Sequence, residues 1–249
     1  MIFRKGIGRM LCQALIIILA QAAVFALAGA QALGAADLFV IVPRELLYLI
    51  PRGNSVELIN LATRISYFVS CLALVIFGAL SLAKDSADGR MEFLLVRPFT
   101  RMEIFFSRMA LGLITVVISC AALFGLWYLT AYLVLPEITA VEIRDILYFS
   151  LRAMGIKAMF WTVSFMWSSM CRIRTSAVCA SLICFFGTYT LGVFPHINEV
   201  LSIASYMSPF HFAFEMALEW IRPTIAGAIA AISLAAGIVA FRRGQFYEL

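Results

Sequence analysis

Charged side chains are scarce in this sequence, at 13% of its 249 residues, whereas 63% of the residues are hydrophobic. A water-soluble domain carries about a quarter of charged residues, and the mean hydropathy of +0.99 is far too high for such a domain. A soluble globule is therefore excluded, and the chain is expected to be an integral membrane protein. Ten-residue segments of alternating hydrophobicity are also missing, which excludes an outer-membrane barrel. The expected fold class is all-α.

The sequence also lacks the common catalytic motifs. It contains no GxxxxGK[ST] phosphate loop, no HExxH, no GxSxG and no Gly-rich dinucleotide turn, so the chain has no evident means of hydrolysing ATP or a peptide. Its two histidines, His196 and His211, have no Ser, Cys or Asp arranged for a triad. The six cysteines show neither CxxC nor Cys/His metal spacing. We expect no enzyme, no metal and no cofactor in this chain.

What the sequence does contain is six long apolar runs. A helix needs about 20 apolar residues to cross roughly 30 Å of hydrocarbon, and backbone groups in lipid must be satisfied within the segment. The runs are 11–33, 65–83, 109–135, 154–170, 176–194 and 224–241. The seven prolines all fall between the runs or at their edges, where a missing amide donor costs least. The first run exceeds the usual signal-peptide core, so we expect a permanent span.

The basic residues predict an orientation. If the N-terminus is cytoplasmic, the inner segments carry 12 of the 19 Lys and Arg residues but only 5 of the 14 acidic ones. Basic residues accumulate on the cytoplasmic side of membrane proteins. Both termini are therefore predicted to be inside. The net charge of +5 is explained by topology and by anionic lipid of the inner leaflet, so no nucleic-acid partner is expected.

One polar interruption, residues 84–108, stands out between the second and third runs. Its sequence resembles the signature of ABC-2-type transporter permeases at eight positions: Asp85, Gly89, Glu92, Leu94, Leu95, Pro98, Thr100 and Arg101. Arg90 stands where the family usually has Thr, and Phe99 where a smaller aliphatic residue is common. Two further resemblances are Ser208-Pro209-Phe210 before the last run and Phe241-Arg242-Arg243 after it. With the six runs, the similarity covers the whole chain.

The resemblance implies a transmembrane subunit that works with a separate ABC ATPase, which binds ATP and Mg. It implies pairing with a second permease, a cytoplasmic membrane of a prokaryote, and most often export. The loop 84–108 would carry an amphipathic coupling helix that docks on the ATPase. Locally, Pro98 is expected to end a turn and Thr100 to cap a helix that begins near Arg101. Arg97 and Arg101 would pair with acids of the partner or with lipid phosphate. A loop that is basic only for topology would not explain its Gly, Glu, Leu-Leu and Pro.

The last outer connection, 195–223, contains a polar stripe. His211, Glu215 and Glu219 recur at i, i+4 and i+8, which places them on one face of a helix. In the family that the chain resembles, this region forms short re-entrant or interfacial helices, so the stripe is a candidate outer gate. An interfacial helix that wets one polar face fits equally well, and a metal site of one His and two Glu is a remote third interpretation.

Two basic residues crowd the fourth run. Arg152 and Lys157 would suggest a substrate path if they lay deep in the membrane, where a charge costs about 2.5–3.5 kcal/mol. The favoured expectation is an interfacial helix from Asp145 that enters the membrane late, with both side chains snorkelling outward. Trp161, Phe165 and Trp167 are expected to be packing residues or interface anchors.

Two other function classes remain open at this point. An ATPase-independent secondary transporter or channel would require an inverted repeat or buried ionisable pairs in broken helices, and neither is evident in the sequence. A membrane scaffold or immunity-type sensor would use the same loop for binding without moving a substrate. The substrate, and whether the permeases pair as identical or sister subunits, are not encoded in these patterns.

Overall fold

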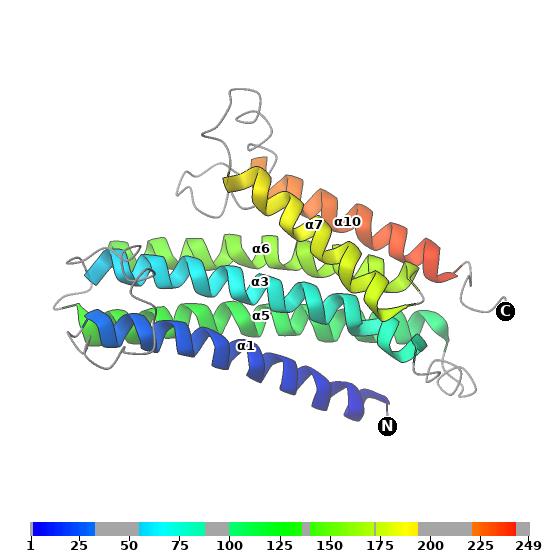
Figure 1. Ribbon diagram of the computed structural model, residues 1–249, viewed down its shortest axis with the longest axis horizontal. Helices are drawn as coiled ribbons and strands as arrows, with labels where there is room; N and C mark the ends of the chain where they lie inside the picture. The colour runs from blue at the N-terminus through cyan, green and yellow to red at the C-terminus, as the bar shows by residue number, and fades with distance from the viewer. Residues whose placement is uncertain are drawn as a thin grey trace.

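The computed structural model describes residues 2–32, 55–87, 100–135, 140–171, 173–193 and 221–242. These residues form six α-helices, shown in Figure 1 and labelled here as in that figure. They are α1 (Ile2–Ala32), α3 (Ser55–Ala87), α5 (Arg101–Val134), α6 (Ala140–Met170), α7 (Arg174–Val193) and α10 (Ile221–Arg242). Each of the six predicted runs falls in a different helix, and no run extends more than one residue beyond the end of its helix.

Three of these helices are long and apolar enough to cross a membrane. The candidate spans are Ile7–Ala30 of α1, Leu58–Asp85 of α3 and Met102–Val134 of α5. A further apolar stretch in α10, Ala226–Arg242, is shorter. The all-helical fold class predicted from composition is thereby confirmed, and the three candidate spans agree with a membrane protein. Crossing by α6, α7 and α10 stays a prediction.

The helices form a bundle around α3, α5 and α6. In Figure 1, α1, α3, α5 and α6 run side by side along the long axis, and α7 and α10 lean across one side of them. α1 packs on α3 and α5, α7 packs on α3 and α6, and α10 packs mainly on α6. The start of α1, the end of α3, the start of α5 and the end of α10 all lie at the same end of the bundle (Figure 1). The segments predicted to be cytoplasmic therefore adjoin this one end.

Trp161 of α6 fills the centre of this bundle. Its side chain is 2% exposed and packs with Leu74, Val116 and Phe165. Two glycines let the neighbouring helices approach it: a Cβ at Gly112 of α5 would overlap the indole ring, and a Cβ at Gly78 of α3 would lie 3.2 Å from the Trp161 carbonyl oxygen. Of the three aromatic residues predicted to be packing residues or interface anchors, Trp161 and Phe165 are packing residues of the buried core.

Serine hydroxyls join the helices near the same end. The backbone N–H groups of Leu82 and Ala83 in α3 donate to Ser168 Oγ of α6, at 2.8 and 2.9 Å. Ser169 Oγ reaches the Gly237 carbonyl oxygen of α10 at 3.4 Å. Such bonds stabilise contacts between helices in an apolar surrounding, where the hydrophobic effect contributes little.

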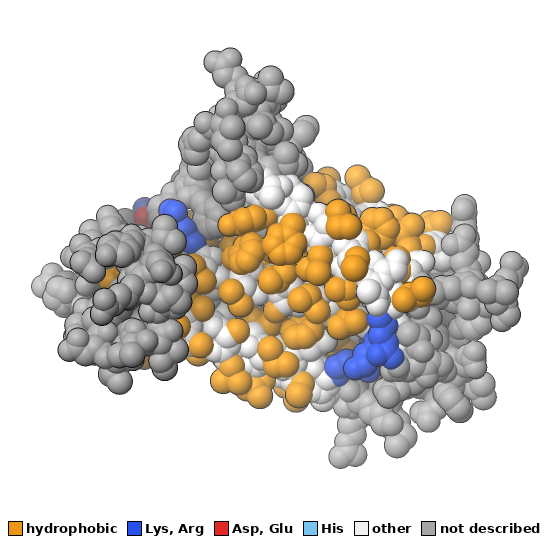
Figure 2. All heavy atoms as spheres, in the orientation of Figure 1, with side chains coloured by type: hydrophobic (Ala, Val, Ile, Leu, Met, Phe, Trp, Pro, Cys, Tyr) orange, Lys and Arg blue, Asp and Glu red, His pale blue; other side chains and the backbone are white. Residues whose placement is uncertain are grey.

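The outer surface matches this architecture. Figure 2 shows hydrophobic side chains over the middle of one face, with Lys and Arg side chains towards its two edges. Leucines of α1 such as Leu11, Leu15 and Leu19 are more than half exposed. A contiguous apolar surface of this extent is typical of a lipid-facing belt.

Candidate functional site: a buried ion cluster and a buried lysine

Asp85, near the C-terminal end of α3, is the centre of a charged cluster. Its side chain is buried, and its carboxylate accepts hydrogen bonds from two arginines on different helices. Arg108 Nη2 of α5 lies 2.7 Å from Oδ2, and Arg9 Nη2 of α1 lies 3.2 Å from Oδ1. Arg9 Nη1 adds a longer bond to Oδ2 at 3.5 Å. One carboxylate therefore holds α1, α3 and α5 together.

The cluster also brackets the connection 88–100. Asp85 lies just before this connection and Arg108 shortly after it, so their ion pair fixes the separation of the two helices that flank it. Arg9 and Arg108 have side-chain exposures of 30% and 14%, so the pairs are only partly solvated. Charge-assisted hydrogen bonds of this kind are roughly twice as strong as neutral ones.

Thr100 sets the start of α5 on the other side of the connection. Its Oγ1 accepts a hydrogen bond from the Glu103 N–H at 3.3 Å, and its own N–H donates to Glu103 Oε2 at 2.8 Å. This is a capping box, which satisfies two of the N–H groups that a helix start leaves without partners. The prediction that Thr100 caps a helix beginning near Arg101 is confirmed.

The predicted coupling loop is shorter in the structure than residues 84–108. α3 continues to Ala87 and α5 begins at Arg101, so Asp85 lies within a helix, and its carboxylate is engaged inside the bundle. The predicted docking residues Gly89, Glu92, Leu94, Leu95, Arg97 and Pro98 lie outside the described residues. The predicted gate residues His211, Glu215 and Glu219 do so too.

Lys157 lies in the middle of α6 and is completely buried. Its Nζ donates to Ser119 Oγ of α5 at 2.9 Å and lies 5.7 Å from the centre of the Tyr67 ring of α3. Gln21 of α1, also completely buried, donates from Nε2 to the Ser119 carbonyl oxygen at 3.2 Å and to its Oγ at 3.4 Å. These contacts therefore form a polar network that links α1, α3, α5 and α6 in the middle of the bundle.

The expectation that Lys157 snorkels outward is wrong. α6 is one continuous helix from Ala140 to Met170, so the stretch from Asp145 and Lys157 belong to the same helix. Lys157 points inward because Ser119 and the Tyr67 ring give its ammonium a hydrogen bond and a cation–π contact there. Arg152, one turn and a half earlier, is half-buried.

Sequence reasoning missed Arg9, Arg108, Gln21 and Ser119. Arg9 and Arg108 were attributed only to topology, and a Ser or Gln within an apolar run carries no signal of its partner. The one available signal was the presence of Gln21 and Lys157 in apolar segments, because polar residues at membrane depth normally face the bundle interior.

Within the described ranges, no group of three or more His, Cys, Asp or Glu side chains is placed to hold a metal ion, and the six cysteines are free thiols. What the described residues offer chemically is fixed charge, hydrogen bonding and helix contact. No protein-family model and no curated protein sequence matches this chain.

Proposed function

We propose that the chain is the membrane-spanning permease subunit of an ABC exporter, driven by a separate ATPase. All six helices then cross the cytoplasmic membrane, with both termini and the 88–100 connection on the inner side. Two such subunits, identical or sister copies, enclose the path for a substrate. ATP and Mg are bound by the ATPase.

The Asp85 cluster is the observation that carries the proposal. A loop that receives force from an ATPase must be connected rigidly to the helices that move, because a slack connection would dissipate the movement. The ion pair of Asp85 with Arg108 joins the two helices that flank the 88–100 connection, and the Thr100 capping box begins α5 directly after it. The resemblance of residues 85–101 to the family signature supports the same role.

The mechanism follows from this connection. ATP binding brings two ATPase subunits together and displaces the docked loop. The displacement passes to α3 and α5 as a unit through Asp85 and Arg108, and to α1 through Arg9. Rigid-body movement of these helices, within the usual repertoire of such transitions, then opens the path outward.

The test uses the full chain, co-purified with an ABC ATPase encoded beside it and reconstituted in liposomes. Leu95→Ala, Glu92→Gln and Arg101→Gln are expected to reduce co-purification and ATP hydrolysis that depends on the permease. Asp85→Asn is expected to leave co-purification intact and to lower the coupled hydrolysis.

Arg144→Gln serves as the matched control, because Arg144 is 64% exposed and pairs only loosely with Asp145, at 3.7 Å. It is expected to behave as the unchanged protein. If the three loop variants leave both binding and coupling intact, the docking assignment is wrong.

Lys157 favours one second candidate, an ATPase-independent transporter. An ionisable side chain completely buried at mid-helix is typical of substrate or proton pathways. However, α6 is continuous through Lys157, and within the described part of the chain no acid pairs with its ammonium. Flux into liposomes driven by a proton gradient, without ATPase and abolished in Lys157→Met, would favour this candidate over the first.

A further inference from the structure

A pocket of about 170 Å³ lies beside the Asp85 cluster, between α1, α3 and α5. Its buried floor is formed by Met10, Gly112 and Trp161. Its half-buried wall includes Gln13, Phe77 and Leu80, so the pocket opens on the surface between α1 and α3. The proposed function uses none of this space.

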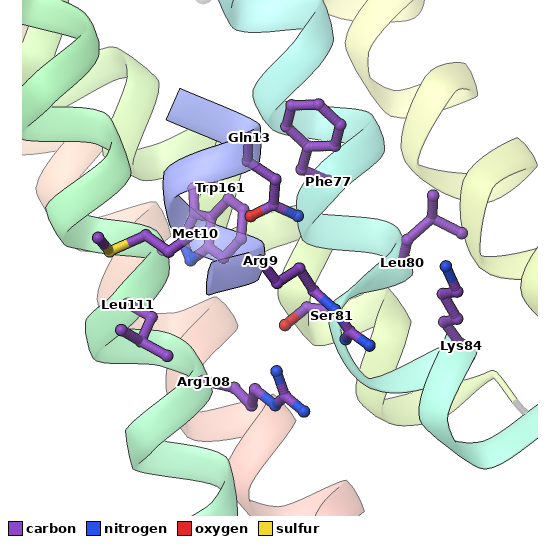
Figure 3. Close-up of a pocket in the computed structure, with 11 residues that line it drawn as sticks. Arg9, Met10, Gln13, Phe77, Leu80, Ser81, Lys84, Arg108, Leu111 and Trp161 are labelled. Carbon is purple, nitrogen blue, oxygen red and sulfur yellow. The ribbon is translucent and has the colours of Figure 1, made fainter. Parts of the chain in front are cut away.

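The lining is cationic, with the Lys84 ammonium beside Leu80 and two guanidinium groups nearer Ser81 (Figure 3). Arg9, Lys84 and Arg108 all contribute to it, and Asp85 is the only acid that the structure pairs with them among the described residues. Three positive charges against one carboxylate leave a formal surplus of two. In Figure 3 the Arg9 and Arg108 guanidinium groups lie near Ser81, and Phe77 lies further along α3.

The arginines keep hydrogen-bonding capacity for a ligand. A guanidinium has five N–H donors, and Asp85 engages one nitrogen of Arg108 and two of Arg9. The remaining donors, the exposed Lys84 ammonium and the Ser81 hydroxyl match the acceptors of a phosphate group, which arginine forks bind in a bidentate manner.

The position of the pocket indicates that the phosphate belongs to a membrane lipid. Arg9, Asp85 and Arg108 lie near the same end of the three candidate spans, Ile7–Ala30, Leu58–Asp85 and Met102–Val134. Charged groups at the end of a span lie at headgroup level. The exposed apolar side chains of α1, Leu11 and Leu15 among them, provide a surface for acyl chains next to the opening.

We propose that this pocket binds the phosphate of an anionic phospholipid, with the acyl chains lying outside it along α1 and α3. The lipid would sit against the ion cluster that flanks the 88–100 connection and would stabilise α1 on the bundle. The proposal does not depend on the ATPase, so it stands or fails separately from the proposed function.

The test measures thermal stability and lipid retention of the full chain in a neutral detergent. The probes are a short-chain phosphatidylglycerol, a phosphatidylcholine of equal chain length, and inorganic phosphate. Phosphatidylglycerol is expected to raise the Tm and to remain bound in native mass spectrometry, and the other two probes are expected to do neither.

Lys84→Gln tests the cation that Asp85 does not engage. Its affinity for phosphatidylglycerol is expected to fall about five-fold, the effect of one basic residue at an anionic surface, whereas Lys84→Arg retains the affinity. Arg144→Gln, a change of equal charge on α6, is expected to have no effect.

Three outcomes would overturn the assignment. Equal binding of phosphatidylcholine, which is zwitterionic, would show that the net negative charge of the lipid plays no part. An equal Tm shift with inorganic phosphate alone would identify a free-anion site. Unchanged affinity in a helical, folded Lys84→Gln protein would place the lipid elsewhere.

Discussion

Asp85 is buried and forms ion pairs with two arginines from neighbouring helices, so its loss should cost more than that of an ordinary surface acid. We expect Asp85→Asn to lower the free energy of unfolding by about 2–3 kcal/mol, less than for a fully buried pair because Arg9 is partly solvated. Unfolding of the full chain in mixed micelles measures the change.

Asp145→Asn is the matched control, because its pair with Arg144 is exposed on both sides. Exposed pairs contribute little, so a change within about 0.5 kcal/mol is expected. Equal effects of the two substitutions would mean that the Asp85 cluster does not hold the helices together.

Ser119 Oγ accepts a hydrogen bond from the buried Lys157 ammonium at 2.9 Å. Ser119→Ala removes this hydrogen bond from a buried charged group, and we expect the free energy of unfolding to fall by about 1–3 kcal/mol. Ser176→Ala on α7, where the hydroxyl is exposed, should change it little. Denaturant titration of the full chain in mixed micelles compares the two variants.

Lys157→Met should behave differently from Ser119→Ala. Replacing a buried charge by an apolar side chain of similar length is often neutral or stabilising, so the Ser119→Ala, Lys157→Met double variant should be more stable than Ser119→Ala alone. If Lys157→Met alone lowers the free energy of unfolding strongly, and the double variant loses the sum of the two single losses, then Lys157 stabilises the bundle independently of Ser119.

At the scale of the helices, α5 contacts α6 through a glycine. We expect Gly112→Ala to lower the Tm, because the new methyl group would displace the Trp161 ring from a packed core. Gly125 lies on the same helix, but a methyl group added there would have open space around it to 4 Å. Gly125→Ala should therefore raise the Tm slightly or leave it unchanged, since Ala favours helix over Gly.

Trp161→Phe provides a second test of the contact between Gly112 and the Trp161 ring. A smaller ring leaves room at the glycine, so Gly112→Ala combined with Trp161→Phe should recover part of the Tm lost in the single glycine variant. No recovery would mean that the glycine matters for a reason other than the indole.

At the scale of the whole molecule, the distribution of charge predicts the orientation in the membrane. A reporter that is active only in the cytoplasm is expected to be active when fused after Leu249 and inactive when inserted in the 136–139 connection. The reason is that basic residues concentrate on the side of the membrane where the C-terminus is predicted to lie. The end of α10 and the end of α5, which precede these two positions, lie at opposite ends of the bundle (Figure 1). The opposite pattern would reverse the topology and remove the 88–100 connection from the reach of an ATPase.

Local and compositional features were predictable from the sequence. The six apolar runs were each found in a helix. For the three candidate spans in α1, α3 and α5 the physical reason is that a backbone in lipid has to form its hydrogen bonds within the segment. The Thr100 cap was predictable because a helix start is determined by residues three positions apart. A charged connection does follow the second run, as predicted, but it is shorter than expected because α3 continues to Ala87 and α5 begins at Arg101.

The contacts that make the candidate site arise only on folding. Arg9 meets Asp85 across 76 residues, Lys157 meets Ser119 across 38, and Gln21 meets Ser119 across 98. Periodicity gives no help with such pairs in this chain, because lipid and core are both apolar and an inward helix face resembles an outward one. Trp161 and Lys157 lie one helical turn apart on α6, and the fit of Trp161 against Gly78 and Gly112, together with the contacts of Lys157 to Ser119 and Tyr67, turns this face inward.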